Sequence, residues 1–168
     1  GVKPLDVRDI REKLEGYVSE MALLSLDSQE QQDVKSRDIA SRHQQFLSET
    51  FINIVGSAQW SHELASDMLA LILSPTIDSI DAQLLISAIM MGALFVADVE
   101  KVLTLMYIYE QAQSEKLRQR ALVGWAFCLD KDALISLQPI DNKLTDLLLR
   151  QQVRDDLLEL QMQIVYCQ

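Results

Sequence analysis

Glycine and proline are scarce in this sequence, which contains five Gly and three Pro among 168 residues. These two residues form most tight turns, so a fold with many short strands would need more of them. Hydrophobic residues make up 49% of the chain and charged residues 24%, and a chain of this length can fill a core without disulfides or metals. We therefore expect long uninterrupted helices and a single all-α domain without β-strands.

Cysteine and histidine are also few, with two residues of each. Cys128 and Cys167 form no CxxC pair, and no His stands near them at the spacing of zinc ligands. We therefore expect neither a disulfide framework nor a zinc site, and two thiols suit a reducing compartment such as the cytoplasm. The first residue is Gly rather than Met and no leader-like segment follows it, so we expect a fragment of a longer chain.

Motifs that bind phosphate groups or carry nucleophilic catalysis are missing, since there is no GxGxxG, GxxxxGK or GxSxG pattern. Cations are outnumbered, with 15 Lys and Arg against 25 Asp and Glu, and the net charge of −10 repels a nucleic-acid backbone. The longest run without a charged residue, 82–97, is shorter than the roughly 20 apolar residues of a membrane-spanning helix. We expect no cofactor, no nucleic-acid partner and no insertion into a membrane.

Apolar residues recur at helical spacing along nearly the whole chain. In the opening segment they follow intervals of three and four residues, at Val7, Ile10, Leu14, Tyr17, Met21 and Leu24. Residues that cap or end helices then divide the rest of the sequence. Further helices are predicted from Asp27 or Ser28 to Gly56, from Ser61 to Ser74, over 80–96, after Asp98 and after Ser114.

These predicted helices differ in polarity. The first half of the second helix, 29–45, is strongly polar, so only its second half should be well anchored. The segment 80–96 is apolar on nearly all sides and should form the centre of the core. A short segment at 132–137 should end before Pro139, and a last helical stretch should run from Asp141 to the C-terminus with a break near Gln151.

A repeated pattern is visible in the second half of the sequence. Between 98 and 130, an apolar helix is followed by one that reads Leu117-Arg118-Gln119-Arg120-Ala121-Leu122, with Gly124 and Leu129 after it. This resembles a HEAT-type repeat, a helical hairpin of about forty residues in which Arg and then Ala stand early in the second helix.

Neighbouring segments resemble the same repeat, so the resemblance covers roughly 61–168. Ala88 matches Ala121 in the hairpin before, which lacks the Arg, and Arg154 matches Arg118 in the unit after, where Leu157 replaces a small residue. Tetratricopeptide repeats are the nearest rival, but their Trp-Leu-Gly-Tyr spacing is absent. The resemblance implies about three stacked antiparallel hairpins in an α–α superhelix, with 5–60 as an N-terminal helical hairpin or cap.

Proteins that resemble HEAT repeats mostly bind other macromolecules on a curved surface. The resemblance therefore implies a non-catalytic scaffold that binds a protein or peptide. It also implies that Arg118 ties neighbouring repeats together through a carboxylate such as Asp81, and that Arg154 occupies the matching place in the next unit. Contact with a ligand is the alternative role for Arg118.

Two other functions stay open. A small helical enzyme would use His62, or the acidic run Asp155-Asp156-Leu157-Leu158-Glu159, whose carboxylates at helical spacing could hold magnesium. That run resembles the aspartate-rich motif of isoprenoid synthases, but no second acidic motif accompanies it, and an exposed His and a solvated acidic face are the simpler interpretation. A self-associating module would pair the helix at 29–45 with a copy of itself.

Two groups of side chains are candidates for a binding surface. Lys116, Arg118 and Arg120 form the densest basic spot, which would either meet an acidic peptide or face water. Aromatic anchors supply much of the binding energy at protein interfaces, although core packing is the alternative for each aromatic residue. Trp125 should be mostly core, whereas Trp60 and Tyr107 should be more open. The aromatic candidates are Trp60, Tyr107, Tyr109 and Trp125.

Overall fold

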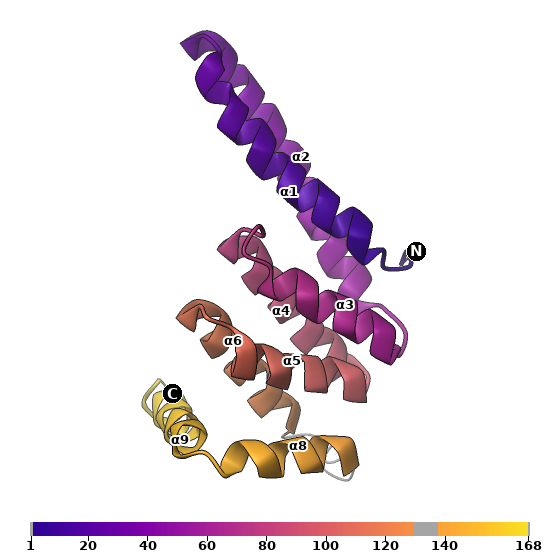
Figure 1. The fold of residues 1–168 in the computed structure, drawn as a ribbon, viewed down its shortest axis with the longest axis vertical. Coiled ribbons are helices and arrows are strands. Elements are labelled where there is room, and N and C mark those ends of the chain that lie inside the picture. Colours follow the sequence, from indigo (N-terminus) through magenta and orange to yellow (C-terminus); the bar gives the residue numbers. More distant parts are fainter. Residues whose placement is uncertain (1, 130–137, 168) are drawn as a thin grey trace.

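The computed structural model describes residues 2–129 and 138–167, and every regular element in these ranges is a helix (Figure 1). The expected all-α fold is thereby confirmed, while the segment predicted at 132–137 lies outside the described residues. A short 3-10 turn, η1 (Leu24–Leu26), separates the first two helices. The helices are α1 (Val7–Leu23), α2 (Gln29–Val55), α3 (His62–Leu73), α4 (Ser79–Phe95), α5 (Val99–Gln111), α6 (Glu115–Leu129), α8 (Gln138–Leu148) and α9 (Gln151–Tyr166).

Most helix starts are fixed by a polar side chain just before the first turn. In six helices this side chain accepts a hydrogen bond from a backbone N–H two or three residues further on, which satisfies a donor that the helix itself leaves unpaired. The predicted ends of two helices are confirmed as well, because α2 is capped by Gly56 and α3 by Ser74. These side chains belong to Asp6, Ser28, Ser61, Asp78, Asp98 and Ser114.

The last helical stretch begins earlier than the sequence suggested. α8 starts at Gln138 rather than at Asp141, because Pro139 is tolerated in a first turn, where its missing N–H has no partner to lose. The predicted break near Gln151 is confirmed. Arg150 has an extended backbone with φ −92° and ψ 128°, and α9 begins at the next residue.

The helices pack in consecutive pairs and in two rows (Figure 1). α1 pairs with α2, α3 with α4, α5 with α6, and α8 with α9. In one row α3 contacts α1 and α5, and α5 contacts α8. In the other row α4 contacts α2 and α6, and α6 contacts α9. Each helix therefore packs mainly on elements that are close to it in the sequence.

The core lies between these two rows. α4 contacts α2, α3, α5 and α6, and it buries Leu85, Ile86 and Ile89 completely. Burial thus accounts for the middle of the apolar run 80–96, whereas Ile80, Leu84, Phe95 and Val96 are exposed. Tyr109 of α5 and Trp125 of α6 are among the largest fully buried side chains, and their rings meet edge to face at 5.7 Å.

Gly92 allows a close approach between α4 and the end of α2. A Cβ atom at this position would lie 3.3 Å from the carbonyl oxygens of Ile54 and Val55 and 3.4 Å from the Lys101 ammonium. These distances are tighter than most Cβ contacts, and two of the three neighbours are backbone atoms. The spacing between the helices here is thus set by a residue without a side chain.

The N-terminal hairpin extends beyond the other helices (Figure 1). α2 is one continuous helix of 27 residues, but its polar first half buries only Ile39, whereas Thr50 and Ile54 are buried in its second half. Only the second half is anchored in the core, as the polarity of 29–45 predicted. The outer end of the hairpin exposes several apolar side chains, which are Val18, Met21, Leu23, Leu26 and Val34.

Candidate interaction surfaces

Three of the four aromatic candidates are buried, so they cannot form an exposed binding surface. Trp125 lies in the core as expected. Trp60 is buried rather than open as the sequence predicts. Its indole N–H donates to Ser57 Oγ at 2.9 Å, so this polar group is satisfied without a hydrogen bond to water. Tyr109 is buried as well, and only Tyr107 remains partly exposed, with the Lys143 ammonium 4.6 Å from its ring.

A buried ion pair holds Trp60 in place. Asp98 Oδ2 accepts a hydrogen bond from the Trp60 backbone N–H at 3.1 Å and lies 3.4 Å from Lys101 Nζ. The same ammonium donates to the Ser57 carbonyl at 3.1 Å and lies 5.6 Å from the Trp60 ring. Asp98 also caps α5, so one carboxylate joins the connection between α2 and α3 to the start of α5. Asp98 and Lys101 therefore bond to groups of the protein itself, and their role is to stabilise the fold.

Arg118 links three helices, but its carboxylate partners are Glu115 and Asp156 rather than Asp81. Its guanidinium donates to Asp156 Oδ2 of α9 at 3.4 Å, to Glu115 Oε2 of α6 at 2.9 Å and to the Tyr109 carbonyl of α5 at 3.3 Å. The buried Tyr109 hydroxyl also donates to Asp156. Burial and this neighbouring carboxylate raise the pKa of Tyr109 well above its usual range.

Asp81 of α4 contacts α2, the helix on the other side of α4 from α6 in the same row. Its carboxylate lies 2.8 Å from His43 Nε2 of α2, and the His43 ring stacks on Tyr17 at 5.0 Å. Burial raises the pKa of Asp81, although the hydrogen bond with His43 opposes this shift. Arg154 stays within its own hairpin, where it donates to the Leu148 carbonyl at 2.6 Å.

A second cluster of charges joins α5 to α8. Glu110 accepts hydrogen bonds from Lys143 at 2.7 Å and from Arg150 at 2.5 Å. Burial by itself would raise the pKa of Glu110, but the two cations outweigh burial and the net pKa lies below its ordinary value of 4.5. This cluster also holds Lys143 over the Tyr107 ring.

The residues proposed for an enzyme do not come together. His62 is exposed and lies 3.4 Å from Glu100, beside a hollow of about 180 Å³ between α3 and α5. Asp155 and Glu159 line a different hollow, on α9. Within 2–129 and 138–167, no group of three or more His, Cys, Asp or Glu side chains could hold a metal ion.

A groove of about 730 Å³ crosses three helices of one row, and we call it the α4–α6 groove. Its lining residues come from α4 and α6, and Gln163 of α9 lines it as well. The basic spot noted in the sequence lies on the α6 wall. The lining residues are Ile80, Gln83, Ser87 and Met90 of α4, Glu115, Lys116, Gln119, Arg120 and Val123 of α6, and Gln163.

The α4–α6 groove is basic although the protein is acidic. Arg120 donates to Ser87 Oγ at 2.8 Å and to Gln83 Oε1 at 3.4 Å, so its partners are neutral. Lys116 is exposed and has no side-chain partner among the described residues. Glu115, the single carboxylate in the lining, is already bound by Arg118. Two positive charges in this groove are therefore uncompensated.

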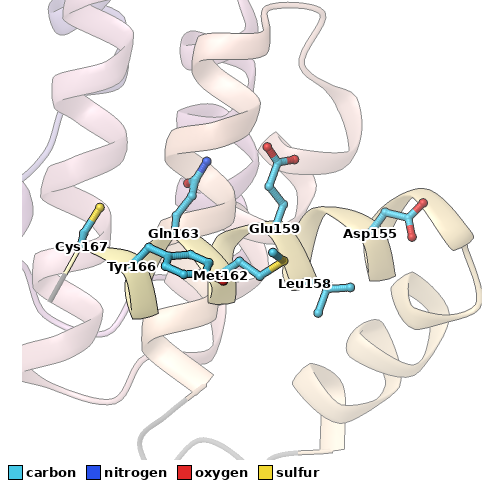
Figure 2. Close-up of a pocket in the computed structure, with 7 residues that line it drawn as sticks. All are labelled: Asp155, Leu158, Glu159, Met162, Gln163, Tyr166 and Cys167. Carbon is cyan, nitrogen blue, oxygen red and sulfur yellow. The ribbon is translucent and has the colours of Figure 1, made fainter.

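A second surface lies on α9 and is shown in Figure 2. Seven residues of this region line a hollow of about 460 Å³, and all of them belong to α9 or follow it directly, so the hollow is an exposed helix face rather than an enclosed cavity. Met162 and Tyr166 lie side by side on this face (Figure 2). The lining residues are Asp155, Leu158, Glu159, Met162, Gln163, Tyr166 and Cys167.

Comparison with protein families, with characterised proteins and with solved structures found no match to this chain. Among the described helices, none combines the length and the apolar character that crossing a membrane requires. The described chain is all-helical, and the α4–α6 groove and the hollow on α9 lie on the same row of helices.

Proposed function

We propose that this chain is a non-catalytic helical-repeat scaffold that binds a peptide or protein segment in the α4–α6 groove. The observation that carries the proposal is the pair of uncompensated cations, Lys116 and Arg120, beside the apolar side chains of Ile80, Met90 and Val123. A segment with a carboxylate next to an apolar side chain would satisfy both features. The acidic surface elsewhere would repel the same segment.

A repeat arrangement of the HEAT type is supported by polar links along the row that carries the groove. His43 of α2 meets Asp81 of α4, Arg120 of α6 meets Ser87 of α4, and Arg118 of α6 meets Asp156 of α9. Each pair of neighbouring helices in this row is thus joined by a side-chain hydrogen bond. Such links hold adjacent hairpins at a fixed spacing, which a continuous binding groove needs.

The test starts from peptides selected on the wild-type protein from a displayed random library. We expect the selected sequences to combine Asp or Glu with an apolar residue. The affinity of each selected peptide for the wild type, for Lys116→Glu and for Arg120→Glu is then measured by fluorescence anisotropy. Loss of an exposed ionic contact costs up to about 1 kcal/mol, which is about fivefold in affinity, and reversal of the charge adds repulsion, so each variant should weaken binding by about fivefold.

Arg37→Glu is the matched control for these variants. It makes the same change of charge on the exposed part of α2, far from the groove along the row. Binding to Arg37→Glu should equal that of the wild type. If the selected peptides bind Lys116→Glu, Arg120→Glu and Arg37→Glu equally well, the α4–α6 groove is not the binding site.

A further inference from the structure

α9 carries a contiguous apolar stripe on its outer face. Leu158, Met162, Val165 and Tyr166 are exposed by 58%, 49%, 60% and 80%. They stand at positions i, i+4, i+7 and i+8, which lie on one side of a helix. The buried residues of α9 are different ones, Val153 and Asp156, which face the rest of the protein.

The place beside α9 continues the row formed by α2, α4, α6 and α9. Each earlier helix in that row is covered by the next one, through the contacts of α2 with α4, α4 with α6, and α6 with α9. The apolar stripe is the corresponding surface of α9, and in the described chain no helix covers it. An occupant that continues this packing would itself be an amphipathic helix.

The charges around the stripe define the chemistry of that helix. Asp155 and Glu159 line the same hollow, and no Lys, Arg or His is among the lining residues. Asp155 accepts a hydrogen bond only from the neutral Gln151, at 2.8 Å, and no cation lies within ion-pair distance of Glu159 among the described residues. A second copy of this chain would bring the same two carboxylates, so a symmetric pairing through this face would place like charges together.

We propose that the α9 stripe binds an amphipathic helix of a partner protein whose apolar face is flanked by Lys or Arg. The apolar side chains would cover Leu158 and Met162, and the cations would meet Asp155 and Glu159. This site is separate from the α4–α6 groove in its charge and in its anchoring residues, although Gln163 borders both. The row of helices would then engage two segments of opposite charge.

The probe is a synthetic helical peptide with Leu at positions i, i+4 and i+7 and Lys on both flanks of that face. A second peptide has Glu in place of each Lys and is otherwise identical. We expect the basic peptide to bind wild-type protein at least about tenfold more tightly than the acidic one, with an affinity that falls as salt is added. Asp155→Asn/Glu159→Gln should abolish most of that preference.

Leu158→Glu/Met162→Glu should weaken binding of the basic peptide by at least about tenfold, because it removes the apolar contacts and would force carboxylates out of water against the Leu face of the peptide. These side chains are exposed, so the variant retains its core. Leu26→Glu/Val34→Glu is the control, since it makes the same change at apolar residues that are more exposed still, at the far end of the N-terminal hairpin. Lys116→Glu should also bind this peptide normally, which separates this site from the α4–α6 groove.

Three results would overturn the proposal. The Leu26→Glu/Val34→Glu variant could lose as much affinity as Leu158→Glu/Met162→Glu, which would show that binding is not specific to α9. The acidic peptide could bind as tightly as the basic one. Sedimentation of the wild type could reveal a dimer that Leu158→Glu/Met162→Glu converts to a monomer, and the occupant would then be a second copy.

Discussion

The hydroxyl of Tyr109 donates a hydrogen bond to the carboxylate of Asp156, so a residue of the α5 core fixes the position of α9. Arg118 and Gln152 donate to the same carboxylate, at 3.4 and 2.8 Å. Asp156 thus collects three donors from α5, α6 and its own helix. The surface that α9 presents depends on this buried contact.

Tyr109→Phe should lower the free energy of unfolding by about 1.5–3 kcal/mol, the usual contribution of a hydrogen bond to a charged group. Asp156→Ala should cost more, because it leaves the buried Tyr109 hydroxyl without its acceptor and also removes one of the three acceptors of Arg118. Urea unfolding followed by circular dichroism gives both values. Tyr166→Phe, at an exposed position, is the control and should match the wild type. A Tyr109→Phe variant as stable as Tyr166→Phe would mean that the contact contributes nothing.

Glu110 should make the free energy of unfolding depend on pH at acidic pH. Its pKa is lower in the folded protein than its ordinary value of 4.5, because the cations of Lys143 and Arg150 outweigh burial. The folded state therefore resists protonation, and the stabilisation is present above pH 4.5 and is lost as the pH falls through the lowered pKa.

The measurement is the difference in unfolding free energy between wild type and Glu110→Gln. It should be largest at pH 7 and should shrink on acidification below pH 4.5. A constant difference between wild type and Glu110→Gln across this range would contradict the assignment.

Two Gly→Ala substitutions should have opposite effects. At Gly92 the added Cβ meets two backbone oxygens at 3.3 Å, so Gly92→Ala should destabilise by about 1–3 kcal/mol. At Gly16, inside α1, the Cβ meets nothing within 4 Å, so Gly16→Ala should stabilise by about 0.5–1 kcal/mol through helix propensity. Thermal unfolding of the two variants gives the comparison. The explanation fails if both variants shift the melting temperature in the same direction.

The two cysteines should differ in reactivity towards a thiol reagent. Cys167 is exposed and Cys128 is buried. We expect one thiol per chain to react with dithionitrobenzoate under native conditions and both to react in denaturant. Cys167→Ser should abolish the native reaction. If that variant still reacts at a rate close to that of the wild type, α6 opens far more readily than its burial implies.

Local features of this fold were predictable because they depend on neighbouring residues. The caps at Ser28, Ser61 and Asp98, and the break before Gln151, follow from side chains close to the bonds that they make. The start of α8 is harder to predict, because Asp141 is a typical N-cap residue and Pro139 is typical of the end of a helical segment, whereas α8 begins at Gln138.

Contacts between distant residues were not predictable in the same way. Trp60 stands among polar residues and was expected to be open, but Asp98 and Ser57 supply its partners and bury it. Lys116 and Arg120 were visible as a basic spot in the sequence. The opposite wall of their groove, at Ile80 and Met90, became apparent only when the packing of α6 on α4 was known.

The packing of each helix on its near neighbours has a consequence for how the chain folds. The main contacts join elements close in sequence, so few long loops must close before stabilising contacts form, and folding should be fast and able to begin at several hairpins. Cooperativity is then transmitted from hairpin to hairpin rather than across one shared centre. Amide hydrogens should exchange first at the outer end of α1 and α2 and in the second half of α9, and last in α4, which is covered on four sides.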